Sequence, residues 1–184
     1  MNFKIDTNQI GRTRVKNVFL VYDNCCFYEI IILNYFMKLT GQETVLCSLD
    51  GKTITCMEGY SVNVDQAIKD INVNEIKCFI ITGGDISDIN NNEIHNLINN
   101  LENKDVIIAA ICAGVDVLED AGVLNNVRST HSEDTDISVD KNIITARANF
   151  YVDFAIEVAK SLNLFENEAD LQETIDFWKY HKRV

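Results

Sequence analysis

Cys112 is the residue whose surroundings most clearly predict chemistry. The local order Ala110-Ile111-Cys112-Ala113-Gly114 places a nucleophile between small residues, as in the sharp strand-to-helix turn called a nucleophile elbow. The apolar run 106–111 is typical of a strand buried on both faces, and the pattern of 115–122 indicates a helix that Gly122 ends. We expect a thiol at a helix N-terminus, where the dipole lowers its pKa.

The chain has six cysteines, and the other five fit the alternative of a free cysteine that packs as a small buried hydrophobe. Their spacings form neither a disulfide framework nor the C-x-x-C pairs of a zinc site. Cys25 and Cys26 are adjacent, which suits neither arrangement. We therefore predict six reduced thiols, no metal and no other cofactor.

Three further features could join this cysteine. Gly83 and Gly84 follow a buried strand and could direct N–H groups at an oxyanion, with the amide of Ala113 as a second donor; the alternative is a plain glycine turn. Glu29 lies among apolar residues, so it either faces solvent or is buried with a raised pKa. His131 lies in an expected loop after the elbow and is either a catalytic residue or an ordinary surface histidine.

Strands and helices alternate along the chain. Buried strands are expected at 17–22, 43–49, 78–82 and 106–111, and a hairpin turn at Asp50-Gly51 introduces a small antiparallel excursion over 53–56 and 60–64. Helices are expected from Asp23-Asn24 to Thr40-Gly41, in a short segment capped by Asp65, and at 90–103, 150–162 and 166–180, with short extended pieces over 127–145.

This alternation predicts an α/β fold with three layers, in which a mostly parallel central sheet is covered on both faces. Ligands of such sheets bind at the carboxyl ends of the strands, near a topological switch point. The start of the first helix, Gly83-Gly84 and Cys112 should therefore converge on one rim.

Composition and charge narrow the function classes. The 184 residues suit a single domain over 17–184, preceded by a polar N-terminal extension over 1–16. The net charge of −12 disfavours binding to nucleic acid, whose phosphates are negative too. We find no secretory signal and no run long enough to span a bilayer, so we expect no membrane association and a cytoplasmic location.

These residues resemble the ThiJ/PfpI superfamily over roughly 17–162. The segments that carry the resemblance are Ile108–Gly114, Glu29 after the first strand, Thr82-Gly83-Gly84, Arg128–His131 and Ile143–Arg147. The resemblance implies a flavodoxin-like sandwich, similar to class I glutamine amidotransferases and usually dimeric. It also implies a reactive elbow cysteine, Cys112, hydrogen-bonded to a protonated glutamate, Glu29.

Members of this superfamily include glutathione-independent glyoxalases and deglycases, so we expect a small aldehyde such as methylglyoxal as the substrate. In the expected mechanism the Cys112 thiolate adds to the aldehyde while the amides of Gly84 and Ala113 hold the oxyanion. Glu29 then moves a proton between the two carbons, and hydrolysis of the thioester gives lactate. His131 would polarise the substrate or only shape the rim.

Other functions stay open. A reactive thiol next to a protonated carboxyl also suits an oxidative-stress sensor or chaperone whose Cys112 oxidises to sulfinic acid. A glutamine amidotransferase would use His131-Ser132-Glu133, but this triplet follows the cysteine closely, and isocyanide hydratases share the superfamily. A Cys-His peptidase is disfavoured because Ala113 stands where peptidases of the superfamily often have histidine.

Overall fold

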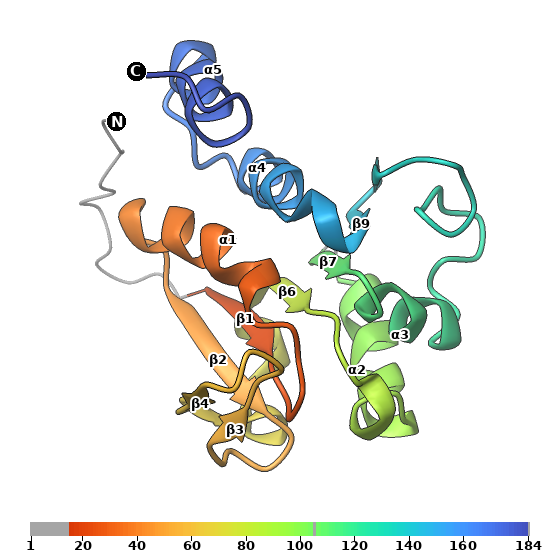
Figure 1. Cartoon of the computed structure of the whole chain (residues 1–184). Helices are drawn as coiled ribbons and strands as arrows, with labels where there is room; N and C mark the ends of the chain where they lie inside the picture. The colour runs from red at the N-terminus through yellow and green to blue at the C-terminus, as the bar shows by residue number, and fades with distance from the viewer. Residues whose placement is uncertain (1–14, 105, 184) are drawn as a thin grey trace.

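The computed structural model describes residues 15–104 and 106–183, which build a seven-stranded sheet with helices on both faces (Figure 1). The strand order is β5-β2-β1-β6-β7-β9-β8, and every neighbouring pair is parallel except β8 with β9. The predicted three-layer α/β sandwich is therefore confirmed. The strands of this sheet are β1 (Lys16–Leu20), β2 (Thr44–Ser48), β5 (Gln66–Ala67), β6 (Ile76–Ile81), β7 (Ile107–Ile111), β8 (Ile137–Asp140) and β9 (Ile143–Ala146).

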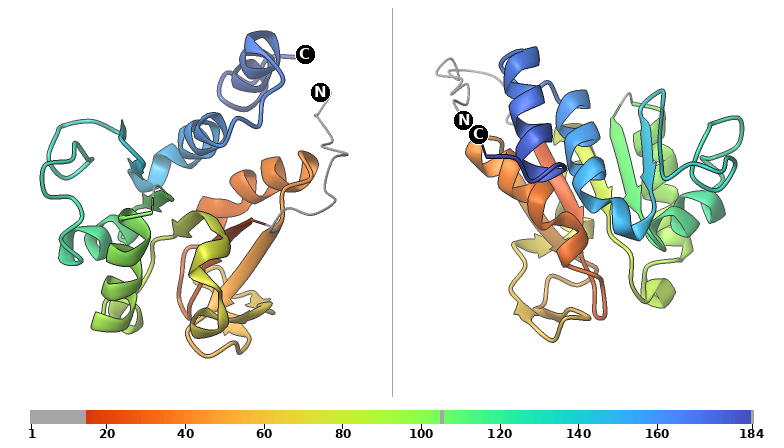
Figure 2. Two further views of the ribbon diagram at one scale, coloured as in Figure 1. Left: turned by 180° about the vertical axis from the view of Figure 1, so that it is seen from behind. Right: turned by 45° about the horizontal axis from the view of Figure 1, so that its top comes forward.

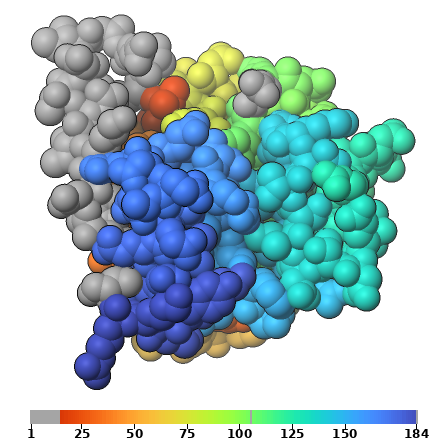
Figure 3. Space-filling model, turned by 90° about the horizontal axis from the view of Figure 1, so that it is seen from above, coloured from red at the N-terminus to blue at the C-terminus, as the bar shows by residue number. Residues whose placement is uncertain are grey.

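The helices form the two outer layers. One face carries α1 (Tyr28–Leu39) and α4 (Tyr151–Ser161) side by side, with α5 (Glu168–Trp178) beyond them, and the other carries α2 (Asn92–Glu102) and α3 (Gly114–Asp120) (Figure 2). Short 3-10 turns connect these elements at η1 (Ile68–Asp70), η2 (Val73–Glu75), η3 (Ile86–Asp88) and η4 (Ala148–Phe150). Seen from above, α4, α5 and the loop after α3 cover this side of the molecule (Figure 3).

The central strands are buried because helices cover both faces of the sheet. In β1, β6 and β7 nearly every side chain is buried, which explains the apolar runs Val18–Leu20, Cys78–Ile81 and Ile107–Ile111 within these strands. Lys16, which we assigned to the N-terminal extension, already belongs to β1, and residues 1–14 of that extension lie outside the described residues. No helix in the described ranges is long and apolar enough to cross a membrane.

Two local predictions are wrong. β3 (Ile54–Thr55) and β4 (Ser61–Val62) do form an antiparallel pair, but Asp50-Gly51 is not a hairpin turn, because β2 pairs with β1 and β5 in the main sheet. Asp65 does not cap a helix either: its carboxylate accepts the backbone N–H of Leu46 at 2.8 Å, and strand β5 follows it. Pairing between distant strands decided both outcomes.

Gly84 joins the carboxyl end of β6 to the segment that leads into α1. It forms an isolated antiparallel bridge with Cys25, and its φ of +120° lies in a region that favours glycine. A β-carbon added there would lie 2.3 Å from the carbonyl oxygen of Asn24 and 2.7 Å from the α-carbon of Cys25. The close approach of these two chain segments therefore requires glycine.

We expect Gly84→Ala to lower the free energy of unfolding by about 2–5 kcal/mol, because backbone strain and a steric clash add together. Gly41→Ala is the matched control: Gly41 also has a positive φ, +70°, but nothing lies within 4 Å of its added β-carbon. The control should cost only about 1–2 kcal/mol of backbone strain. Urea denaturation of both variants measures the difference, and equal losses would contradict the close approach at Gly84.

Candidate active site

The sharp turn that we expect at Cys112 is present. β7 ends at Ile111, the Cys112 backbone has a φ of +57°, and its N–H donates to the carbonyl of Ala146 in β9 at 2.9 Å. A positive φ is uncommon for a residue with a side chain, and strain of this kind is typical of a nucleophile elbow. A β-carbon on Gly114 would lie 2.7 Å from the carbonyl oxygen of Ile81, so the small residue after the elbow lets α3 start against the end of β6.

Glu29 lies in the first turn of α1 and is only 1% exposed, which decides between the two alternatives that the sequence left open. Its Oε2 accepts the backbone N–H of Gly83 at 2.7 Å and lies 3.0 Å from the hydroxyl oxygen of Thr82. Its other oxygen, Oε1, is buried and has no hydrogen-bond partner within the described part of the chain. The carboxyl is therefore held between α1 and the end of β6, and the Cys112 thiol is a further hydrogen-bond partner.

Burial raises the pKa of Glu29, and the hydrogen bond from the Gly83 amide only partly opposes this effect. Burial also raises the pKa of the half-buried Cys112 thiol, the charge of Glu29 adds to the rise, and the Ala113 amide opposes it. The prediction that the pKa of this thiol is lowered is therefore wrong, because desolvation outweighs the lowering effect of the Ala113 amide at the start of α3. Thiol and carboxyl thus compete for a proton, and a protonated Glu29 would no longer oppose the thiolate.

Gly83 lies at the point where these two side chains meet. A β-carbon on Gly83 would be 2.5 Å from Cβ and 2.8 Å from Sγ of Cys112, and 3.0 Å from Oε2 of Glu29. Because its N–H already donates to Glu29, Gly83 is not the free oxyanion donor that we expected. The amides of Gly84 and Ala113 stay predicted oxyanion donors.

Sequence reasoning missed residues that position the pair. The hydroxyl of Tyr22, 3% exposed, contacts the carbonyl oxygens of Thr82 at 2.8 Å and Gly83 at 2.9 Å. From the β3–β4 excursion, the carboxylate of Glu58 accepts the backbone N–H groups of Phe27 and Tyr28 at the start of α1. A threonine directly before two glycines was the visible signal for Thr82, whereas nothing local marked the tyrosine.

The structure places His131 on the loop after α3, where its ring contacts two carboxylates rather than the elbow thiol. Nδ1 lies 2.7 Å from Oε2 of Glu119 and Nε2 lies 3.5 Å from Oδ1 of Asp116. Glu133, the last residue of the amidotransferase-like triplet, is exposed. The structure therefore places Cys112 and Glu29 together, whereas His131 contacts Asp116 and Glu119.

Asp116, Glu119 and His131 are also the group of side chains in the described ranges that could hold a metal ion. Their ligand atoms lie within 4.8 Å of one another. All three side chains are solvent-accessible, and the two ring nitrogens already contact the carboxylates. Exposed groups of this kind are common without a metal, so the arrangement does not by itself indicate one.

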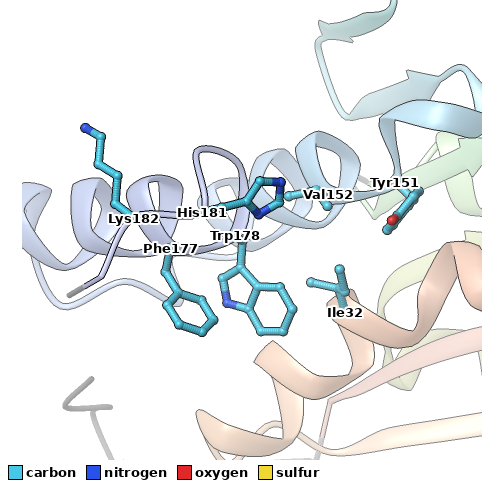
Figure 4. A pocket seen from close by; sticks show the side chains of 7 residues that line it. All are labelled: Ile32, Tyr151, Val152, Phe177, Trp178, His181 and Lys182. Atoms are coloured by element: carbon cyan, nitrogen blue, oxygen red, sulfur yellow. The ribbon is translucent and has the colours of Figure 1, made fainter.

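A groove of about 440 Å³ lies on the helical face of the molecule and contains none of the predicted site residues (Figure 4). It is bounded by α1, α4 and the end of α5, where Trp178 packs edge-on against Phe36 with ring centroids 5.7 Å apart. The lining side chains are Ile32, Tyr151, Val152, Phe177, Trp178, His181 and Lys182. The groove thus shares no lining residue with the site around Cys112.

The pKa of Glu29 predicts how pH affects stability. A buried acid with a raised pKa keeps its proton where the unfolded chain has lost it, so its contribution to stability is full at low pH and disappears as pH rises through the raised pKa. Glu29→Gln has no such proton. We expect its gain in melting temperature over the wild type to grow from pH 5 to pH 8.

Thermal unfolding followed by circular dichroism measures this gain at each pH. Glu133→Gln, which changes an exposed carboxyl, is the control and should show no growing gain. A gain for Glu29→Gln that is constant or shrinks with pH would contradict the raised pKa.

The comparisons agree with this fold. A family model described as the DJ-1/PfpI family matches residues 15–161. A deglycase from Pyrococcus abyssi is 30% identical over 105 residues, which are 55% of this chain and 63% of the relative. The match therefore spans less than two thirds of that relative's own length.

Solved structures are similar over nearly the whole chain. A DJ-1 superfamily protein from Agrobacterium tumefaciens superposes with a TM-score of 0.81 at 25% identity, covering 91% of this chain and 100% of the other. A thiJ/pfpI family protein from Bacillus anthracis gives a TM-score of 0.79 at 22% identity, with 91% of each chain covered. The second likeness, below 25% identity, supports the fold alone.

Proposed function

The chain belongs to the DJ-1/PfpI family, and from this premise we propose that it is a cysteine-dependent, glutathione-independent glyoxalase or deglycase that acts on methylglyoxal-type aldehydes. The observation that carries the proposal is the buried Glu29 carboxyl held against Cys112 at the end of β6. The deglycase names of curated relatives at about 30% identity support it.

The proposed reaction starts when the Cys112 thiol loses its proton to water and the thiolate, beside a Glu29 that still carries its own proton, adds to the aldehyde carbon. The new C–S bond pushes the carbonyl electrons onto oxygen, where the N–H groups of Gly84 and Ala113 can stabilise the charge. No hydrogen bond within the described ranges occupies the Gly84 amide. Two donors and a nucleophile at the same rim are what an addition to a carbonyl needs.

Glu29 has the position of the acid and base in the next step. The acid first gives its proton to the oxygen that formed. The resulting carboxylate then takes the proton of the former aldehyde carbon and returns it to the neighbouring ketone carbon while the hydroxyl proton passes to the ketone oxygen, so the first carbon is oxidised to a thioester and the second is reduced to an alcohol. Water then cleaves the thioester and frees Cys112. The sum is methylglyoxal plus water giving lactate, with no external oxidant or reductant.

Purified protein incubated with methylglyoxal in the absence of glutathione tests the proposal. We expect loss of methylglyoxal with formation of an equal amount of lactate, measured by proton NMR. Loss of the aldehyde without lactate, together with a stable adduct on the protein by mass spectrometry, would overturn catalysis. The bovine serum albumin control measures non-enzymatic adduct formation.

A second candidate function is an oxidation sensor. The observation that favours it is the half-buried Cys112 with the Ala113 amide and the Glu29 carboxyl beside the sulfur, since both could hydrogen-bond sulfinate oxygens. Intact-mass analysis after mild peroxide should then show two oxygens added at Cys112, while the buried Cys78 stays unmodified.

A homodimer and a cytoplasmic location stay predictions.

A further inference from the structure

We propose that Thr82 is a positioning residue that keeps Glu29 protonated, because its hydroxyl oxygen accepts a hydrogen bond from the carboxylic acid of Glu29. The inference deepens the proposed function, since it concerns the same site. Its test measures the protonation of one carboxyl and stands apart from any turnover of aldehyde.

The number of hydrogens on the Thr82 hydroxyl decides which group donates between Thr82 and Glu29. A threonine hydroxyl carries one hydrogen, and the Thr82 Oγ1 lies 2.6 Å from the carbonyl oxygen of Cys26, which can only accept. That short contact uses the hydrogen. Toward Oε2 of Glu29, at 3.0 Å, the hydroxyl then offers a lone pair. A carboxylate oxygen would be repelled by a lone pair, whereas a carboxylic acid would donate to it.

The surrounding contacts hold this arrangement in place. The backbone N–H of Cys26 donates to the carbonyl of Gly83 at 2.8 Å, so Cys26 is bound to both residues at the end of β6. Thr82 itself is fully buried, and the Tyr22 hydroxyl contacts the carbonyl oxygens of Thr82 and Gly83. The Thr82 side chain therefore has little freedom to turn its hydrogen toward Glu29.

The remaining partners of the Glu29 carboxyl agree with the neutral form. Oε2 accepts the Gly83 N–H at 2.7 Å, and the hydroxyl oxygen of an acid can accept that bond while it donates its own hydrogen. Oε1 is buried and has no hydrogen-bond partner among the described residues. The Cys112 thiol is the carboxyl's other hydrogen-bond partner, and a thiol is a weak donor. One backbone donor and one weak donor are little for a buried carboxylate, and an unpartnered oxygen costs less in a neutral acid than in an anion.

The consequence for Cys112 follows from charge. The carboxylate of Glu29 raises the pKa of the Cys112 thiol, so holding the proton on Glu29 removes this opposition to the thiolate. A Thr82 hydroxyl that instead donated to Oε2 would stabilise the carboxylate and lower the pKa of Glu29. The two arrangements predict opposite effects when the hydroxyl is removed.

Infrared spectroscopy of a Cys112→Ser protein tests the proposal, because this background leaves the carboxyl to titrate without the thiol. The carboxylic acid C=O band of Glu29 is assigned by its loss in Glu29→Gln. We expect the band to disappear about one pH unit lower in Thr82→Val than in the parent, and Thr82→Ser to restore the parent midpoint.

Thr145→Val is the matched control, because Thr145 is also fully buried and its hydroxyl accepts the backbone N–H of Thr130 instead. Its midpoint should equal that of the parent. If Thr82→Val does not fold, Thr82→Ala removes the same oxygen without an added methyl group and must give the same shift. A band that persists to higher pH, or an unchanged midpoint, would overturn the proposal.

A second readout uses the intact thiol. With Cys112 present, Thr82→Val should raise the pH midpoint of iodoacetamide alkylation at Cys112, since a more readily ionised Glu29 opposes the thiolate. A lower or unchanged midpoint would count against the proposal. Failure of the glyoxalase assay with success of both measurements here would refute the reaction while leaving the role of Thr82 in place.

Discussion

Replacing Cys112 by serine is expected to lower kcat/KM for methylglyoxal by about 10³-fold or more. A serine hydroxyl is far harder to deprotonate than a thiol, and the described residues place no strong base beside it, only a buried carboxyl whose pKa is raised. The backbone strain at this position stays the same in the variant, so the loss would report the sulfur itself. Steady-state loss of methylglyoxal, without glutathione, measures it.

Cys26→Ser is the control for this prediction. Cys26 is the other half-buried thiol near the site, its Sγ lies 3.8 Å from the sulfur of Met57, and burial raises its pKa to about 11. The pKa of the Cys112 thiol is raised too, but the Ala113 amide opposes that rise, whereas burial and nearby negative groups all raise the pKa of Cys26 and make it the poorer nucleophile. The control should keep turnover within about threefold, and an equal loss in both variants would mean that Cys112 is not the nucleophile.

Glu29→Gln is expected to lower kcat by about 10²- to 10⁴-fold and to change KM little, because an amide cannot carry a proton from one carbon to the next. The shape of the side chain is kept, and the amide oxygen of the introduced glutamine can still accept the N–H of Gly83. Stopped-flow measurement of thioester formation in the variant separates this step from the first addition. A variant that keeps its kcat would remove Glu29 from the reaction.

The two effects of this substitution have the same physical origin. The burial that raises the pKa of Glu29 costs stability at neutral pH, and the same raised pKa lets the carboxyl both give and take a proton. A Glu29→Gln protein that is more stable at pH 8 and nearly inactive would therefore support both predictions at once. A protein that is inactive because it is unfolded would support neither.

Local signals in the sequence predicted the elements that are determined within a few residues. The elbow at Cys112 is one: the chain must turn sharply between a strand and a helix, and Gly114 must be small because the end of β6 lies against it. The buried strands are another, since a continuous apolar run of four or five residues has few other solutions in a sheet covered on both faces.

Two local predictions failed because distant segments pair with the residues concerned. Asp50-Gly51 has the composition of a hairpin turn, but the strand before it found partners on both sides in the parallel sheet. Asp65 has the composition of a helix cap, but the N–H of Leu46 took its carboxylate. A turn or cap residue supplies a local preference of about 1 kcal/mol, and tertiary pairing readily outweighs it.

The burial and protonation state of Glu29 could likewise not be predicted from the local sequence. Whether Glu29 is exposed or buried depends on how α1 packs across the end of β6, 53 residues further along the chain. The same packing commits the amide of Gly83 to the carboxyl and sets Thr82 and Tyr22 around it. The sequence by itself determined which groups could react, because reactivity starts from side-chain chemistry and a strained local turn. Only the tertiary structure decided which of these groups holds a proton, because desolvation and hydrogen bonding depend on the neighbours packed around a residue and not on the residue alone.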